Sequence, residues 1–186
     1  FELYVDICQL GLDQRRANIL GREVADKLKW KKPVVVSHHM ILGLQGVQPG
    51  ADKEEIMMTS KMSKSKPDTC IYMHDSEEDI KRKISKAYCP EKIIEGNPLF
   101  DYLKYLVFKR YASITITRPE KFGGNLTLTY SELEKVYLEG KLHPMDLKVA
   151  TVFYLNEMIV PIREYFTTNA HAKALYEEVK RYSITR

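Results

Sequence analysis

The sequence predicts an α/β first part followed by a mostly helical second part. Leu3 and Val5 alternate with polar neighbours in a strand pattern that runs to Gly11, and residues 14–28 have a helical pattern. The β-branched run 34–36 is too short for a helix and is typical of a buried parallel strand. Strand, helix and strand in this order indicate one unit of a doubly wound sheet, on which ligands bind at the carboxyl ends of the strands.

Helix signals follow at regular intervals. Ser76 is expected to cap a helix that carries acids in its first turn and bases later, an order that complements the helix dipole. Asn97-Pro98 has the cap and first-turn proline of another helix. From about residue 93 onward helices dominate, which predicts a boundary between a domain of residues 1–92 and one of residues 93–186.

The second part also contains a predicted β-ribbon. Residues 114–116 and 126–128 alternate, and the stretch between them contains glycines. Ser131 and Glu134 are expected to form a capping box for a short helix that stops at Gly140.

Two helices are expected to end the chain. The first covers residues 145–166, and Pro161 is expected to kink or divide it. The second covers residues 170–182.

The composition limits the class of protein and the partners that the chain can bind. The 186 residues are 44% hydrophobic and 29% charged, with a net charge of +4, which is ordinary for a globular protein and permits nucleic-acid binding. No apolar run approaches the roughly 18 residues that span a bilayer. Three cysteines without paired spacing favour a reducing compartment and predict no zinc site. The chain begins at Phe1 inside a strand pattern, which suggests a piece of a longer protein.

One basic run stands out. Residues 61–66 hold three lysines and three hydroxyl or thioether residues before Pro67, which keeps the preceding residue out of helical geometry. Ammonium groups and small hydroxyls suit phosphate oxygens. A solvated basic loop would explain a random run of this composition equally well. The letters of residues 61–65 spell KMSKS, however.

That run resembles the second signature of class I aminoacyl-tRNA synthetases, the loop that holds ATP phosphates. Further blocks, in order, are similar to the archaeal and eukaryotic tyrosyl-tRNA synthetases. These blocks are QLGLDQRR at 9–16, KAYCP at 86–90, EGNP at 95–98, RPEKFGG at 118–124 and HPMDLK at 143–148. The resemblance covers nearly the whole chain. It implies the C-terminal part of a Rossmann-like class I catalytic domain, followed by a mostly helical anticodon-binding domain with a small β-ribbon.

The resemblance also implies roles in catalysis. Lys61 and Lys64 would hold the β- and γ-phosphates as the carboxylate of tyrosine attacks the α-phosphorus, and Ser63 and Ser65 would add hydroxyl donors. Met62 belongs to the same ATP-binding run. The backbone around Met40 and Leu42 lies where the family cradles adenine.

The remaining implied roles concern tyrosine and tRNA. Gln14 would contact the substrate tyrosine, although a glutamine opening a helix is the simpler interpretation without the family. Arg15 would contact the acceptor stem, or be a plain solvated arginine. Phe122 and His143 would stack on the first anticodon base, a guanine, and Asp146 would accept from its Watson–Crick edge. Spacing alone favours a core Phe beside a glycine turn and an Asp in a helix's first turn.

The predicted function is therefore tyrosine–tRNA ligase, with ATP and Mg²⁺ as substrate, no tightly bound cofactor and no metal site. Tyrosine and tRNA(Tyr) are the expected partners, in a cytoplasmic homodimer with no membrane contact. A HIGH-type motif is absent from the sequence, so the isolated chain is predicted to be inactive. The alternatives are an inactive half that only binds the anticodon arm, and a different class I ligase.

Overall fold

The computed structural model describes residues 4–47, 62 and 66–182. The chain separates into two compact units, residues 1–41 and 42–186, each of which is described by itself. This division reflects contacts within the chain. The predicted functional boundary after residue 92 lies inside the second unit and stays a prediction.

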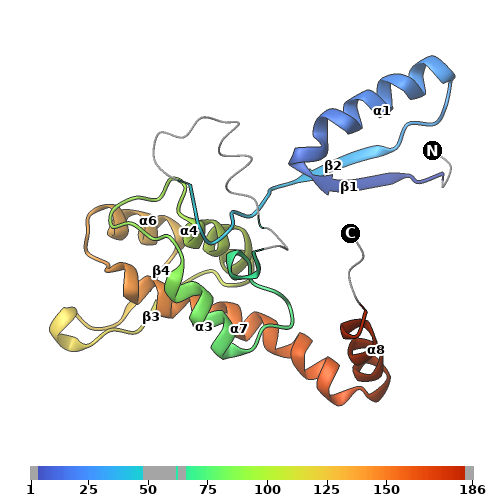
Figure 1. The fold of residues 1–186 in the computed structure, drawn as a ribbon. Helices are drawn as coiled ribbons and strands as arrows, with labels where there is room; N and C mark the ends of the chain where they lie inside the picture. The colour runs from blue at the N-terminus through green and yellow to red at the C-terminus, as the bar shows by residue number, and fades with distance from the viewer. Residues whose placement is uncertain (1–3, 48–61, 63–65, 183–186) are drawn as a thin grey trace. The chain divides into compact units, whose positions relative to one another are not determined.

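The first unit is the predicted strand–helix–strand. Strand β1 (Ile7–Gly11) leads through a short 3-10 turn, η1 (Leu12–Gln14), into helix α1 (Arg15–Leu28), which returns the chain to strand β2 (Val34–His38) (Figure 1). The two strands are parallel, with Ile7 opposite Val34 and Gly11 opposite His38. The prediction of one βα unit with a parallel strand pair is confirmed.

The expected burial of the second strand is not found. Val34 is 60% exposed and Val36 is 45% exposed. A sheet of two strands with one helix offers too little apolar area to cover both of its faces. The β-branched run correctly predicted the strand. The burial of its side chains depends on neighbouring elements, which the run itself does not specify.

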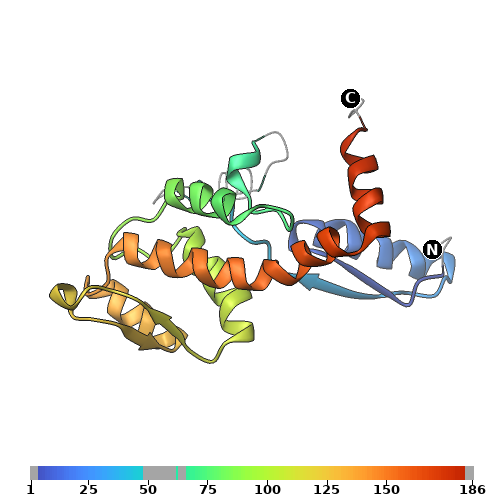
Figure 2. The same cartoon turned by 90° about the horizontal axis from the view of Figure 1, so that it is seen from below.

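The second unit is built around α7 (Pro144–Thr168), against which α3 (Glu77–Lys86) packs. Figure 2 shows both helices, with the ribbon of β3 (Ile114–Ile116) and β4 (Leu126–Leu128) near the start of α7. The strands are antiparallel, as predicted, with Ile114 opposite Leu128. The other elements are η2 (Pro67–Thr69), α4 (Pro98–Tyr102), the π-turn η3 (Leu103–Val107), α5 (Phe108–Arg110), η4 (Glu120–Phe122), α6 (Tyr130–Leu138) and α8 (Ala170–Lys180).

The core of this unit consists of side chains from nearly every element. Its fully buried members include Ile80, Ile84, Leu99, Leu103, Ile114, Leu133, Tyr137 and Leu147. The ring of Phe100 meets that of Tyr137 edge to face, with centroids 4.9 Å apart. This core packs α7 against α3, α4 and β3.

One local prediction is wrong, and another is wrong in part. The capping box of α6 is Thr129 with Glu132, not Ser131 with Glu134. Thr129 accepts from the N3 backbone, and Glu132 accepts from the Thr129 backbone N–H at 2.8 Å. In addition, Pro161 does not divide the helix, since α7 continues through it to Thr168, whereas a kink at Pro161 stays a prediction. A proline removes one helical hydrogen bond, and the buried residues Leu155 and Ile159 hold this part of α7 in the core.

Candidate functional site

A cavity of about 600 Å³ lies at the start of α7. Three segments line it: the loop after α3, the turn between β3 and β4, and the connection from α6 into α7. Its lining residues include Glu91, Lys92, Arg118, Phe122, Lys141, His143, Met145 and Asp146. The three residues expected to read a base therefore line one cavity, with Phe122 brought there from more than twenty residues before His143 and Asp146.

The aromatic ring of Phe122 is exposed to solvent. This residue ends the single turn of η4, and Gly123 stops that turn in the left-handed region at φ 94°. The ring is 60% exposed, and the Lys121 ammonium lies 4.9 Å from its centroid. The interpretation of Phe122 as a core residue is wrong for the described structure. An exposed aromatic ring beside a cation is a suitable surface for a planar base.

His143 is held by the helix that it begins. It is the N-cap of α7, and its Nδ1 accepts a hydrogen bond from the backbone N–H of Met145 at 3.1 Å. In the neutral ring the proton therefore lies on Nε2, which is 3.9 Å from Glu91 Oε1. The cap fixes the plane of an exposed imidazole at the cavity wall.

Asp146 lies in the first turn of α7, where its backbone N–H bonds to the His143 carbonyl at 3.1 Å. Within the part of the chain that the structure describes, its carboxylate has no hydrogen bond or ion pair. A half-buried carboxylate of this kind is available to accept from a ligand's N–H groups.

Arg118 is a site residue that sequence reasoning missed. Its Nε donates to the Gly124 carbonyl at 3.0 Å and its Nη1 to the Lys141 carbonyl at 2.9 Å. These bonds join the turn that carries Phe122 to the connection that leads to His143. The RPEKFGG block contained this arginine, but nothing in the sequence specified the carbonyl it would reach.

The residues expected to bind tyrosine and the acceptor stem lie in the first unit. Gln14 is exposed at the start of α1, and its amide donates to Asp13 Oδ2 at 3.1 Å. Arg15, the first residue of α1, is exposed. A Cβ on Gly11 would lie 2.5 Å from Met40 Sδ, so the missing side chain leaves room for Met40 at the carboxyl end of β1.

The expected ATP-binding residues are described only in part. Lys61, Ser63, Lys64 and Ser65 lie outside the described residues, and Met62 is half-buried. Leu42 belongs to the second unit, where its backbone N–H donates to Asp101 Oδ2 at 2.8 Å beside a cavity of about 200 Å³. Among the described residues, no group of three His, Cys, Asp or Glu side chains could hold a metal ion.

Together, the cavity offers an aromatic face, an oriented imidazole, an accepting carboxylate and the basic side chains of Lys92 and Lys141. This combination can bind an unpaired nucleobase by stacking and by contacts to its donor edge, with cations available for the adjacent phosphates. A family model described as tRNA synthetases class I (W and Y) matches residues 1–159. The chain belongs to this family.

Individual relatives agree with the resemblance seen in the motifs. The chain is 43% identical to "Tyrosine--tRNA ligase 1, cytoplasmic" of Arabidopsis thaliana and 42% identical to the tyrosine–tRNA ligase of Saccharolobus solfataricus. These matches cover all of the chain, but 46% and 52% of the two relatives. The class I synthetase chain thus spans about half the length of these curated relatives.

Solved structures give the same result for the fold. The tyrosyl-tRNA synthetase of Pyrococcus horikoshii, complexed with L-tyrosine, matches with a TM-score of 0.83 and 40% identity over 96% of this chain and 52% of that one. The prediction that the chain belongs with the archaeal and eukaryotic tyrosyl-tRNA synthetases is confirmed. In the described residues of this synthetase chain, no helix has the length and apolarity needed to cross a membrane.

Proposed function

We propose that the protein containing this chain is a tyrosine–tRNA ligase. In the first step the carboxylate of tyrosine attacks the α-phosphorus of ATP, tyrosyl-adenylate forms and pyrophosphate leaves. In the second step a ribose hydroxyl at the 3′ end of tRNA(Tyr) attacks the adenylate's carbonyl carbon, and AMP leaves. ATP enters as its Mg²⁺ complex.

The KMSKS run supplies the charge for the first step. Lys61 and Lys64 hold the β- and γ-phosphates, whose negative charge grows as pyrophosphate departs, and Ser63 and Ser65 donate to the same oxygens. This is electrostatic stabilisation and requires no general base. Met62 belongs to the same run.

The other substrate contacts are assigned to residues outside the KMSKS run. The backbone around Met40 and Leu42 accommodates adenine, and Gln14 accepts from the ammonium of tyrosine. Arg15 contacts the acceptor stem.

One observation carries the tRNA half of the proposal: Phe122, His143 and Asp146 line one cavity. Phe122 and His143 stack on the first anticodon base. The Asp146 carboxylate accepts from N1–H and N2–H of guanine. With adenine in the same place, the carboxylate would face N1, which is an acceptor, and the two would repel. The pair of donors therefore selects guanine.

The wider assignments follow the resemblance. Residues 1–92 belong to the catalytic domain and residues 93–186 to the anticodon-binding domain. The complete enzyme is a homodimer. It acts in the cytoplasm, the location that the name of the Arabidopsis relative gives for that protein.

Charging of tRNA by the complete protein tests this function. Purified protein should attach tyrosine to tRNA(Tyr) and exchange pyrophosphate into ATP only when tyrosine is present. The Lys64→Ala variant should lose both activities while it still binds tRNA. Exchange that depends on another amino acid would indicate a different class I ligase.

A second function, binding of the anticodon arm alone, is supported by the cavity that Phe122, His143 and Asp146 line. The isolated 186-residue chain is expected to bind the arm and to show no tyrosine-dependent exchange above its own Lys64→Ala variant. Exchange by this chain alone would contradict the binding-only function.

A further inference from the structure

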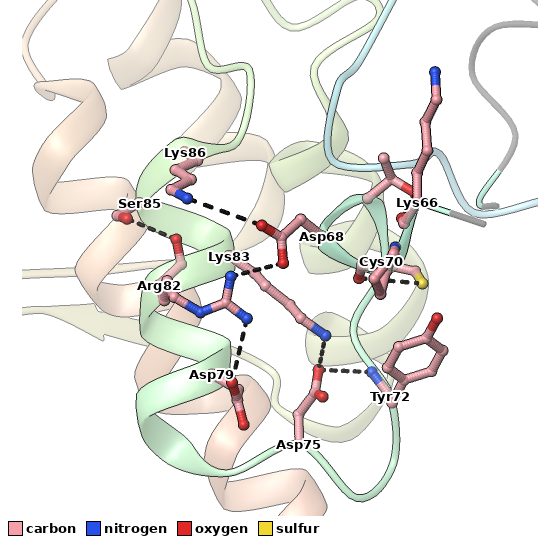
Figure 3. Close-up of polar contacts among 12 residues, drawn as sticks. Lys66, Asp68, Cys70, Tyr72, Asp75, Asp79, Arg82, Lys83, Ser85 and Lys86 are labelled. Atoms are coloured by element: carbon pink, nitrogen blue, oxygen red, sulfur yellow. Dashed lines mark hydrogen bonds and ion pairs between the residues drawn. The ribbon is translucent and has the colours of Figure 1, made fainter. Parts of the chain in front are cut away.

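Asp75 is a buried residue in the segment that follows the KMSKS run, and its carboxylate makes several contacts. Its side chain is 7% exposed, and Oδ2 accepts from Lys83 Nζ at 2.6 Å and from the Tyr72 backbone N–H at 2.9 Å (Figure 3). The Lys83 ammonium also lies 4.5 Å from the centroid of the Tyr72 ring. One carboxylate thus ties the turn before α3 to the interior of α3.

The other end of the segment is tied to the same helix. Asp68, in η2, pairs with Arg82 at 2.6 Å and with Lys86 at 3.8 Å (Figure 3). The Arg82 hydrogen bond lowers the pKa of Asp68 below its ordinary value of 3.8, which keeps this pair charged near neutral pH. The segment 66–75 is therefore attached to α3 at both of its ends.

A third attachment comes from α7. Arg163 donates from Nη1 to the Asp75 backbone carbonyl at 2.8 Å, and from Nη2 to Asn156 Oδ1 at 2.5 Å. Asn156, seven residues earlier on α7, orients the guanidinium and donates to Glu77 Oε2 at 3.4 Å. A half-buried, doubly engaged arginine holds one backbone carbonyl more firmly than a flexible ammonium would.

The helix that supplies Arg163 also carries the base cavity. Asp146 lies in the first turn of α7 and Arg163 lies roughly 25 Å further along the helix axis. Because α7 is continuous between them, the segment after the KMSKS run is held by the helix that presents His143 and Asp146.

We propose that Arg163 is a positioning residue for ATP-dependent activation of tyrosine. Through the carbonyl of Asp75 it fixes the described segment 66–75, which follows the KMSKS run in the sequence. The inference rests on the proposed function, which assigns phosphate binding to the KMSKS run, and on the hydrogen bonds that Arg163 and Asp75 make.

Arg163 is a better test position than Asp75. Removing the Asp75 carboxylate would leave the Lys83 ammonium buried without its partner, and that variant would fail to fold for reasons unrelated to positioning. Arg163→Met keeps the length of the side chain and removes the donors. Arg163→Lys restores one donor. Lys148→Met is the matched control, because Lys148 also donates from α7 to a backbone carbonyl, that of Ser85, at 2.8 Å.

Amide hydrogen exchange on the 186-residue chain measures the tether directly. In Arg163→Met the amides of Thr69, Tyr72 and Asp75 should exchange roughly 10- to 100-fold faster, since a hydrogen bond from a charged donor is lost. Lys148→Met should leave these three amides unchanged, and Arg163→Lys should restore part of the protection. Unchanged exchange in Arg163→Met would overturn the proposal.

Kinetics of the complete protein supply the second readout. Arg163→Met should lower kcat for tyrosine-dependent pyrophosphate exchange about tenfold with KM for tyrosine unchanged, and Arg163→Lys should recover most of it. Faster exchange of amides with unaltered kcat and KM for ATP would contradict a positioning role. An unmutated protein without tyrosine-dependent activity would refute the proposed function instead, and the amide measurement would still decide whether Arg163 holds the segment.

Discussion

The imidazole of His143 accepts the backbone N–H of Met145, with Nδ1 and N 3.1 Å apart. One ring therefore caps α7 and forms part of the wall of the base cavity. A cap satisfies a helix N–H group that has no intrahelical acceptor, and here it also fixes the orientation of the ring. The stability of the helix start and the geometry of the site depend on the same side chain.

Two substitutions separate these roles. His143→Asn keeps a capping side chain and should leave the free energy of unfolding nearly unchanged, whereas His143→Ala should lower it by about 1 kcal/mol. Both should weaken binding of an anticodon stem-loop RNA by roughly 1–3 kcal/mol, because both remove the stacking ring. Urea unfolding and fluorescence anisotropy measure the two effects. Full RNA affinity in His143→Asn would show that the ring does not stack.

The hydroxyl of Tyr137 joins α6 to the loop after α3. It donates to the Pro90 carbonyl at 2.8 Å and lies 3.2 Å from Cys89 Sγ. Burial raises the pKa of this phenol well above its usual value, so it remains a donor at any working pH. Tyr137→Phe should lower the free energy of unfolding by about 1–2 kcal/mol because the carbonyl loses its partner. Tyr165→Phe, at a 56% exposed ring, should change it little in the same urea titration.

Gly96 has no room for a side chain. Its φ is 70°, and a Cβ there would lie 2.7 Å from the Val47 carbonyl oxygen. Gly96→Ala should lower the free energy of unfolding by roughly 1–3 kcal/mol through backbone strain and this clash. At Gly21, inside α1, an added Cβ meets no atom within 4 Å, and Gly21→Ala should instead stabilise the helix by about 0.5–1 kcal/mol. Thermal unfolding measures both variants. Equal changes in stability for Gly96→Ala and Gly21→Ala would contradict these predictions.

Asp79 makes stability depend on pH in the acid range. A hydrogen bond from the Ser76 hydroxyl, and then one from Arg82, hold its pKa below the ordinary 3.8. The unfolded state therefore binds the proton first, so the stabilisation is present above 3.8 and is lost as pH falls through the lower folded pKa. Asp79→Asn should be less stable than the native chain at neutral pH, and the difference should shrink in strong acid. A difference in urea midpoint that is constant with pH would contradict this assignment.

Local signals in the sequence predicted most elements of the fold. Ser76 and Asn97 are N-caps whose side chains bond to the first turn, and the alternation at 114–116 and 126–128 does form the ribbon. The capping box of α6 was predicted two residues too late in the sequence. Thr129 and Ser131 both offer a hydroxyl, and each is followed by an acid three positions later. Only the three-dimensional path of the ribbon decides which one begins the helix.

The candidate site was less predictable from local signals. Phe122, His143 and Asp146 were identified through the family resemblance, since their spacing alone favoured structural roles. The contacts of Arg118 and Arg163 are with backbone carbonyls far away in sequence, at Lys141 and Asp75. A carbonyl acceptor has no residue type, so no sequence pattern indicates such a bond.

The most direct test of the base-reading cavity is the affinity of the 186-residue chain for two anticodon stem-loop RNAs that differ only in guanine or adenine at the first anticodon position. The chain should bind the guanine RNA roughly 10-fold or more tightly. Asp146→Asn should lose most of that preference while retaining a folded α7, because the asparagine amide presents a donor as well as an acceptor. Equal affinity of the unmutated chain for the two RNAs, or an undiminished preference in Asp146→Asn, would contradict the account.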